Sequence, residues 1–321
     1  MDESRKNTLL NIINSMENDV ISGKDISMEY ERILFPPERR EYELTYFGKE
    51  SEEEILSKTL SSPFQEDRTF GIENEGWLNK LVFGDNLQIL KHLVELKRSG
   101  HLCNSDGTPG ARLIYIDPPF SSKQDFGSND QRAYSDKMKG AEFLEWLRKR
   151  LVLLRELLSD NGAIYVHLDW RKSHYIKVLM DEIFGEQNFR NEIIWHYGTY
   201  VGQTKNNFPK KHDTILFYGK TSNRIFHPQH DNHPENDANY KRWKGYFNSD
   251  NEIIGSYYPK KDSKFSGYVK KFIKKNNKEP SENDVLLKVE GKLVDSVWDI
   301  QSVNPMSKER IGYPTQKPEE L

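Results

Sequence analysis

The sequence predicts an α/β protein built on an open, doubly wound and mostly parallel sheet. Short apolar runs alternate with helical patterns from residue 77 to about residue 220, and this alternation is typical of βαβ units. An Asp-Pro-Pro-Phe tetrapeptide follows the apolar run at residues 113–116, and open α/β sheets bind ligands where strands end. A 35% hydrophobic fraction over 321 residues is enough for one large packed core.

The pattern of the first 70 residues predicts a helix, and nothing in this segment indicates catalysis. Leu9, Ile12, Ile13 and Met16 recur at helical spacing, and an acidic run follows near residue 50. We expect residues 1–70 to form an accessory helical segment, which would serve either as the arm of a homodimer or as a solvated cap.

Residues 71–221 form the expected catalytic region. Its candidate strands are Lys80–Gly84, Arg112–Ile116, Ala163–Leu168, Glu192–Tyr197 and Thr214–Tyr218. A helical pattern starts at Leu87, and an apolar stripe at helical spacing runs from Phe143 to Leu158. A further helix is expected over residues 173–184, where Gly185 ends it.

The loop at Asp117, Pro118, Pro119 and Phe120 carries the candidate chemistry, and we expect it at the carboxyl end of a central strand. Asp117 and the Pro118 carbonyl can each accept one hydrogen of an amino group. Phe120 offers a flat face on which a base can stack. Two prolines in succession remove backbone freedom. The combination suits methylation of an exocyclic amino group on a nucleobase.

Several further motifs agree with this interpretation. They are Gly84-Asp85-Asn86, Tyr134-Ser135-Asp136, Gly162 to Asp169, and Tyr313-Pro314-Thr315-Gln316-Lys317-Pro318. In this order and spacing the chain resembles the β-class DNA amino-methyltransferases, in particular the modification subunits of type III restriction-modification systems. The resemblance runs from about Trp77 to the last residue and is weaker near residues 222–295.

The resemblance implies a Rossmann-like methyltransferase that uses S-adenosylmethionine to methylate adenine N6 in a specific sequence of duplex DNA. The cofactor-binding residues that it implies are Asp85, Asn86, Asp117, Thr315, Gln316, Lys317 and Pro318. For Asp85, a helix N-cap is an equally strong interpretation. A restriction subunit is a further implied partner.

One family motif is missing from the sequence. The resembling enzymes carry a Phe-x-Gly-x-Gly loop after the Thr-Gln-Lys-Pro segment, and this chain contains none. We therefore expect residues 298–321 to be the start of a truncated cofactor-binding part, and the chain to be an N-terminal fragment or to be completed by a partner chain. Such a chain is expected to bind the cofactor weakly and to be inactive alone.

Residues 222–297 are the expected target-recognition insertion. Counted from the sequence, residues 241–278 carry a net charge of +8 and eight aromatic residues, within a protein of net charge −3. Basic and aromatic residues together suit a surface that follows phosphates and stacks on bases. The candidate DNA-binding residues are Lys241, Arg242, Lys244, Lys270, Lys271, Lys274 and Lys275.

Composition excludes several other classes of protein. Cys103 is the only cysteine, so the chain has neither an intrachain disulfide nor a cysteine-rich zinc site. His227, His230 and His233 fit a polar loop better than a ligand set, and we expect no metal. No window approaches 18 consecutive apolar residues, so we expect a cytoplasmic protein without a membrane partner.

Three alternatives stay open from the sequence. The chain could be a non-catalytic DNA-recognition fragment, a cytosine-N4 methyltransferase, or an enzyme that methylates RNA or a glutamine amide. The basic aromatic insertion and the motif order favour DNA.

Overall fold

The computed structural model describes residues 3–23, 30, 42–70, 79–120, 125–128, 131–135, 140–198, 205–231, 233–255, 263–304, 306–313 and 315–321. The helices are α1 (Glu3–Ile21), α3 (Glu52–Lys58), α4 (Asn86–Arg98), α5 (Gly140–Leu157), α6 (Ser173–Phe184), α7 (Ala238–Trp243) and α8 (Ser266–Asn276). The strands are β1 (Ala111–Ile116), β2 (Asp125–Ser128), β3 (Gln131–Ser135), β4 (Leu158–Leu168), β5 (Phe189–His196), β6 (His212–Gly219), β7 (Glu252–Ile254), β8 (Val285–Lys288) and β9 (Val297–Asp299). Short 3-10 helices cover Glu186–Asn188, Pro234–Asn236, Lys244–Tyr246 and Ser263–Phe265.

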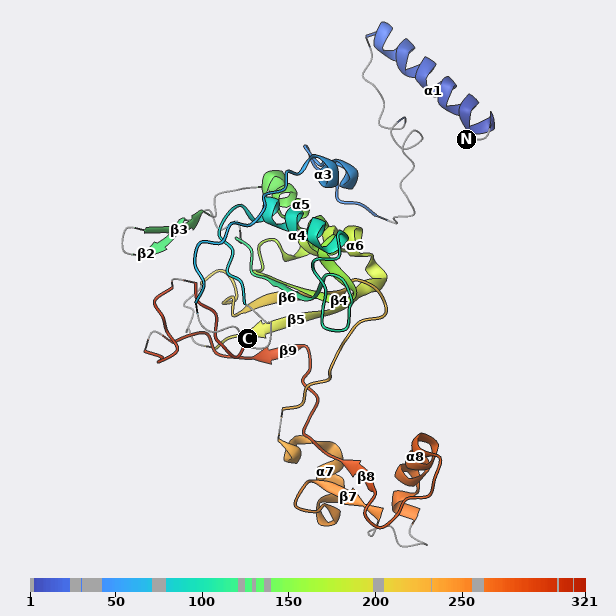
Figure 1. Cartoon of the computed structure of the whole chain (residues 1–321), viewed down its shortest axis with the longest axis vertical. Helices are drawn as coiled ribbons and strands as arrows, with labels where there is room; N and C mark the ends of the chain where they lie inside the picture. The colour runs from blue at the N-terminus through green and yellow to red at the C-terminus, as the bar shows by residue number, and fades with distance from the viewer. Residues whose placement is uncertain are drawn as a thin grey trace.

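A five-stranded sheet in the order β1-β4-β6-β5-β9 forms the centre of the main body (Figure 1). β1 runs parallel to β4, and β5 runs parallel to β9. β6 runs antiparallel to both of its neighbours. The α/β fold is therefore confirmed, with parallel pairs at the two ends of the sheet and one antiparallel strand between them.

The main core lies between one face of this sheet and helices α4, α5 and α6 (Figure 1). Side chains alternate along β4, so Ile164 and Val166 join the helix-side core while Ala163 faces the opposite side. On that opposite face a smaller cluster holds Ile193 and Phe217. The predicted stripe is buried as its helical spacing indicated: Phe143, Leu147, Leu151 and Leu154 lie on α5. The stripe does not continue as helix to its last member, because Leu158 is the first residue of β4.

A close approach of backbones fixes the start of β4. A Cβ atom added at Gly162 would lie 2.8 Å from the carbonyl oxygen of Ala111 in β1. The register between these strands also shifts here, between Ala111 and Leu113. Glycine is therefore needed at this bulge for steric reasons.

The predicted strand at Lys80–Gly84 is wrong. These residues have an extended, irregular backbone in which Leu81 and Phe83 are fully exposed. A strand requires a hydrogen-bonded neighbour, and no described strand pairs with this segment. The helix expected after it is present as α4.

Part of the N-terminal segment packs on the α/β core. Ile55 of α3 is buried in the main core, and Tyr46 donates a hydrogen bond to Glu145 of α5 at 2.6 Å. Lys49 forms an ion pair with Glu182 of α6 at 2.8 Å. The expected helix over Leu9 to Met16 is present as α1, which stands apart from this body in Figure 1.

Helices α7 and α8 and strands β7 and β8 form a smaller module, separate from the sheet in Figure 1. The chain enters and leaves this module along two adjacent segments, joined by backbone hydrogen bonds from Asp231 to Lys292 and from Val294 to Gln229. This module falls within the insertion expected over residues 222–297. Within the described residues, no helix is long and apolar enough to span a bilayer.

Candidate active site

The Asp117–Phe120 loop begins where β1 ends. Its position after a strand is as predicted, but the strand is not central. β1 is the edge strand of the sheet formed by the described residues, because none of their strands pairs with its second side. Leu113 and Tyr115 of β1 alternate with the buried Ile114, so they lie on the sheet face opposite the helices, where they are 64% and 46% exposed.

The Thr315–Pro318 segment reaches this loop from 200 residues further along the chain. Lys317 donates a hydrogen bond from Nζ to Oδ2 of Asp117 at 2.9 Å. The same ammonium group lies 5.2 Å from the centre of the Phe120 ring. The structure therefore brings two of the predicted motifs together through an ion pair and a cation–π contact.

Gln316 holds this segment in shape. Its Nε2 donates a hydrogen bond to the carbonyl oxygen of Glu309 at 2.8 Å, and its Oε1 accepts one from the amide of Ile311 at 2.9 Å. Pro318 is buried and Thr315 is half-buried. Gln316 thus stabilises the turn from which Lys317 extends.

A buried histidine lies next to this loop, within the Gly162 to Asp169 motif. His167 is completely buried at the end of β4. Its Nδ1 is 3.1 Å from the hydroxyl of Tyr115 and 3.6 Å from Oδ1 of Asp117. Its Nε2 is 3.1 Å from Oδ2 of Asp213 on β6. The imidazole therefore lies between two carboxylates, one of which belongs to the predicted catalytic loop.

Two tyrosines complete the hydrogen bonds of this cluster. The hydroxyl of Tyr197 donates to Oδ1 of Asp213 at 3.2 Å. Partial burial raises the pKa of Tyr115 well above its usual range, and the nearby charges of Asp117 and Asp213 add to this effect. Burial likewise raises the pKa of Tyr197, beside Asp213. Both hydroxyls consequently stay protonated as hydrogen-bond donors at neutral pH.

Asp85 and Asn86 lie at the start of α4. Asp85 caps the helix by accepting a hydrogen bond from the amide of Leu87 at 2.9 Å. Arg150 of α5 donates from Nε to Oδ1 of Asn86 at 2.6 Å and pairs with Asp85 at 3.3 Å. The Arg150 guanidinium also lies 3.9 Å from the centre of the Trp146 ring.

Arg150 is a residue that sequence reasoning missed. Burial lowers its pKa to about 10, against the opposing influence of the Asp85 charge. It remains cationic at neutral pH and fixes the Asp85–Asn86 turn. An arginine within the apolar stripe of a helix was the available signal, because a buried cation requires partners.

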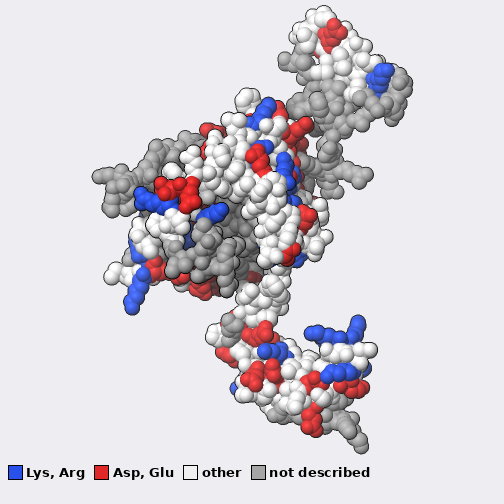
Figure 2. Space-filling view, viewed as in Figure 1, with Lys and Arg blue, Asp and Glu red and all other residues white. Residues whose placement is uncertain are grey.

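The predicted DNA-binding side chains are exposed in the small module. Lys241, Arg242 and Lys244 belong to α7 and the turn after it. Lys270, Lys271, Lys274 and Lys275 are exposed on α8. Figure 2 shows basic side chains gathered over α8.

Part of the aromatic content of this module forms its core rather than a stacking surface. Trp243 and Phe265 are buried in its core, with Tyr246, Phe247 and Tyr268 packed around them. Composition could not separate a stacking surface from a small core, and the module needs these rings to bury enough apolar area. Tyr257 and Tyr258 lie outside the described residues.

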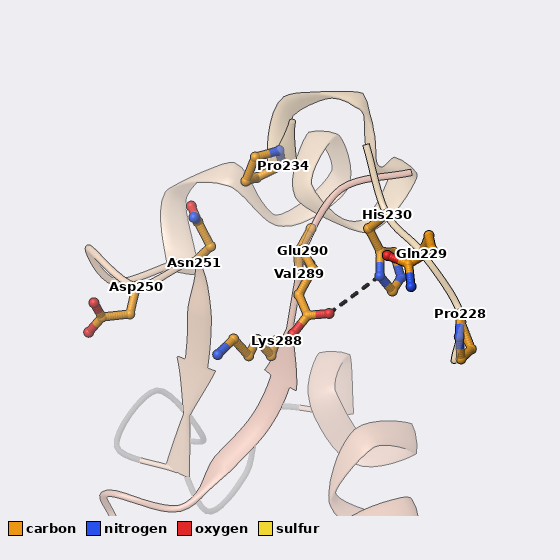
Figure 3. A pocket seen from close by; sticks show the side chains of 9 residues that line it. All are labelled: Pro228, Gln229, His230, Pro234, Asp250, Asn251, Lys288, Val289 and Glu290. Carbon is orange, nitrogen blue, oxygen red and sulfur yellow. Dashed lines mark ion pairs between the residues drawn. The ribbon is translucent and has the colours of Figure 1, made fainter. Parts of the chain in front are cut away.

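A hollow of about 470 Å³ in the small module is open and polar (Figure 3). His230 on one side of it pairs with Glu290 at 3.3 Å. His233 pairs instead with Glu235 at 3.2 Å. Among the described residues, no group of three histidine, cysteine or acidic side chains is placed to hold a metal ion. The hollow shares no lining residue with the Asp117 loop.

One protein-family model and several proteins of known function match this chain. A family model described as DNA methylase (N6_N4_Mtase) matches residues 111–321. The type II methyltransferase M.EcaI of Enterobacter cloacae is 34% identical over 246 residues, which are 76% of this chain and 48% of that protein. The EcoP15I Mod subunit of a type III restriction-modification enzyme of Escherichia coli is 26% identical over 58% of this chain and 31% of its own length.

The StyLTI Mod subunit of a type III restriction-modification enzyme of Salmonella typhimurium is 28% identical over 56% of this chain and 30% of its own length. The chain thus spans half or less of each of these relatives.

Proposed function

This chain belongs to the DNA methylase family, and we propose that it transfers a methyl group from S-adenosylmethionine to the N6 amino group of adenine in duplex DNA. The observation that carries the proposal is the contact of Lys317 with Asp117 and Phe120. Two motifs 200 residues apart line one site at the end of a strand.

The loop has the groups that an amino acceptor needs. An exocyclic amino nitrogen is a weak nucleophile because its lone pair is delocalised into the base. Acceptors for both of its hydrogens draw that lone pair back to nitrogen, and Asp117 and the Pro118 carbonyl are such acceptors. Phe120 offers a face for a base extruded from the duplex.

The same residues fit the proposed cofactor. S-adenosylmethionine supplies a methyl group already activated by a positively charged sulfur. A carboxylate and an aromatic face stabilise such a cation, and Asp117 and Phe120 provide both. We assign the wall of the cofactor site to Thr315–Pro318, with Asp85 and Asn86 as further candidates. The protein then acts mainly by alignment of the reacting atoms.

The exposed lysines of α8 support the proposed substrate. Four of them lie within six positions on one short helix, where they can follow a phosphate backbone. The resemblance to Mod subunits also supports adenine as the target and a restriction subunit as a partner. Cytosine N4 is the alternative target.

Transfer of a radiolabelled methyl group to DNA tests this proposal. The protein is incubated with labelled S-adenosylmethionine and duplex DNA, both as this chain alone and as the longest form of the enzyme that can be purified, and the DNA is digested to nucleosides and separated. We expect the longest form to place label in N6-methyladenine. Label in N4-methylcytosine would correct the target base, and label in neither nucleoside with the longest form would refute the function.

A further inference from the structure

We propose that His167, oriented by Asp213, is a positioning residue that acts through Asp117 and takes up the proton released during methylation. The inference rests on the proposed function and assigns a task to a buried side chain that the chemistry above leaves unused. It begins from the position of one imidazole between two carboxylates, at 3.1 and 3.6 Å.

The hydrogen bonds fix the tautomer of His167. An ionised carboxylate can only accept, so Nε2, which faces Asp213, carries the ring hydrogen. Asp213 accepts a second hydrogen bond from the Tyr197 hydroxyl. Nδ1 is then a lone pair that accepts from the Tyr115 hydroxyl. A neutral imidazole therefore presents its basic nitrogen toward Asp117.

The arrangement gives the released proton a route. As the amino nitrogen bonds to the methyl carbon, the carbon–sulfur bond breaks and its electron pair stays on sulfur. The nitrogen then loses one proton to the Asp117 carboxylate. Nδ1 of His167 lies 3.6 Å from Oδ1 of Asp117. An approach of about half an ångström, together with rotation of the Tyr115 hydroxyl hydrogen away from Nδ1, allows a hydrogen bond and transfer.

Two carboxylates flank the imidazole that receives the proton. An imidazole is a stronger base than a carboxylate. The resulting cation would lie between the charges of Asp117 and Asp213, while Asp117 regains its own charge and is ready to accept the next amino group. The other described neighbours in ring contact are the uncharged Trp195 and Phe120.

The charged and titratable groups around His167 come from several elements. Tyr115 and Asp117 belong to β1 and its loop, and Asp213 belongs to β6. Tyr197, directly after β5, bonds to Asp213, and the buried carboxylate of Asp169, directly after β4, lies near both. Lys317 reaches the cluster only through Asp117. The cluster is thus built to receive one proton from Asp117.

The first test needs no activity. The histidines of the protein are labelled with nitrogen-15, and the His167 signals are assigned by comparison with His167→Asn and Asp213→Asn. We expect the Nε2–H tautomer at neutral pH and protonation of Nδ1 as the pH falls. A hydrogen on Nδ1 at neutral pH, or a ring that stays neutral until the protein unfolds, would overturn the proposal.

The second test is the rate of a single methyl transfer as a function of pH. His167→Asn keeps a polar side chain but removes the base, so we expect the rate constant to fall about tenfold to hundredfold. Affinity for DNA should stay within about twofold of the parent. The decrease in rate at acid pH, caused by protonation of Nδ1 before the reaction, should disappear.

Asp213→Asn keeps the volume of the side chain and removes its charge. The His167 cation is then less stable, so the acid limb of the rate profile should move to lower pH. His227→Asn, at an exposed histidine of a surface loop, is the control and should behave as the parent does. A purely structural role for His167 predicts no movement of this limb.

The outcomes separate the two proposals. A parent protein that transfers no methyl group to DNA would overturn the proposed function and the role of His167 with it. A parent that methylates DNA, with a His167→Asn variant of equal rate and equal pH profile, would overturn the role of His167 alone.

Discussion

The two oxygens of the Asp117 carboxylate have different neighbours. Oδ2 accepts a hydrogen bond from Lys317, and Oδ1 faces Nδ1 of His167. An ionised carboxylate can accept several hydrogen bonds, so Asp117 can keep Lys317 and still receive an amino hydrogen. Lys317 therefore balances the charge of Asp117 without blocking it.

Replacement of Lys317 by glutamine should reduce the rate only modestly. The ion pair is 24% exposed at Lys317 and 32% exposed at Asp117, and such pairs contribute roughly 0.2–1 kcal/mol. We expect kcat/KM for DNA methylation to fall by up to about fivefold. Lys308→Gln, at an exposed lysine of the same region, should leave it unchanged. A loss beyond about a hundredfold would mean that Lys317 does more than balance charge.

At the level of elements, Arg150 connects α5 to the first turn of α4. Its planar guanidinium donates to Asn86 and to the carbonyl oxygen of Trp146, and stacks on the Trp146 ring. The single ammonium group of lysine cannot form this set of hydrogen bonds and the stacking contact together. Arg150→Lys should therefore lower the free energy of unfolding by about 1–2 kcal/mol, measured by urea denaturation. Arg98→Lys, at a 56% exposed arginine, serves as the control and should change stability by less than about 0.5 kcal/mol.

Helix α8 should determine how DNA affinity depends on salt. If Lys270, Lys271, Lys274 and Lys275 each contact one phosphate, their replacement by glutamine removes four contacts. The slope of log affinity against log salt should then fall by roughly 3.6, at about 0.9 per contact. Fluorescence anisotropy at several salt concentrations measures this slope, and an unchanged slope would show that α8 does not bind DNA.

A matched control for α8 lies in the same region of the chain. Lys278 and Lys292 already form ion pairs with Asp284 and Asp295. Their replacement by glutamine should therefore alter the salt slope much less than replacement of the α8 lysines.

At the level of the whole molecule, α3 is part of the main core. Ile55 is 1% exposed there, whereas Ile13 of α1 is 53% exposed. Ile55→Ala should lower the free energy of unfolding by about 2–5 kcal/mol, because it leaves a cavity. Ile13→Ala should change it by less than about 0.5 kcal/mol. Equal effects in urea denaturation would show that α3 does not stabilise this core.

The sequence was sufficient to predict the parts of the site that depend on local pattern. An apolar run and two prolines located the loop at Asp117, and helical spacing located α5 and α6. The segment at Lys80–Gly84 contains a short apolar run, but a strand depends on a partner that this run does not supply.

Contacts set by strand register could not be predicted in this way. Antiparallel pairing places His167 of β4 opposite Ile215 of β6. Asp213 is therefore a diagonal neighbour of His167 on the same face, which brings the two side chains together. The sequence separates them by 46 residues and gives no register. The role of the aromatic residues in the small module could not be predicted either, because their number fits a core and a binding surface equally well.

The most direct test of the central claim is methyl transfer to duplex DNA by Asp117→Ala. Removal of the carboxylate leaves one amino hydrogen without its acceptor while the DNA-binding module is untouched, so turnover should be abolished and DNA affinity largely retained. Asp160→Ala, at a 90% exposed aspartate, should match the parent. Activity of Asp117→Ala within about tenfold of the parent, a barrier change of only about 1.4 kcal/mol, would contradict the proposed role of Asp117.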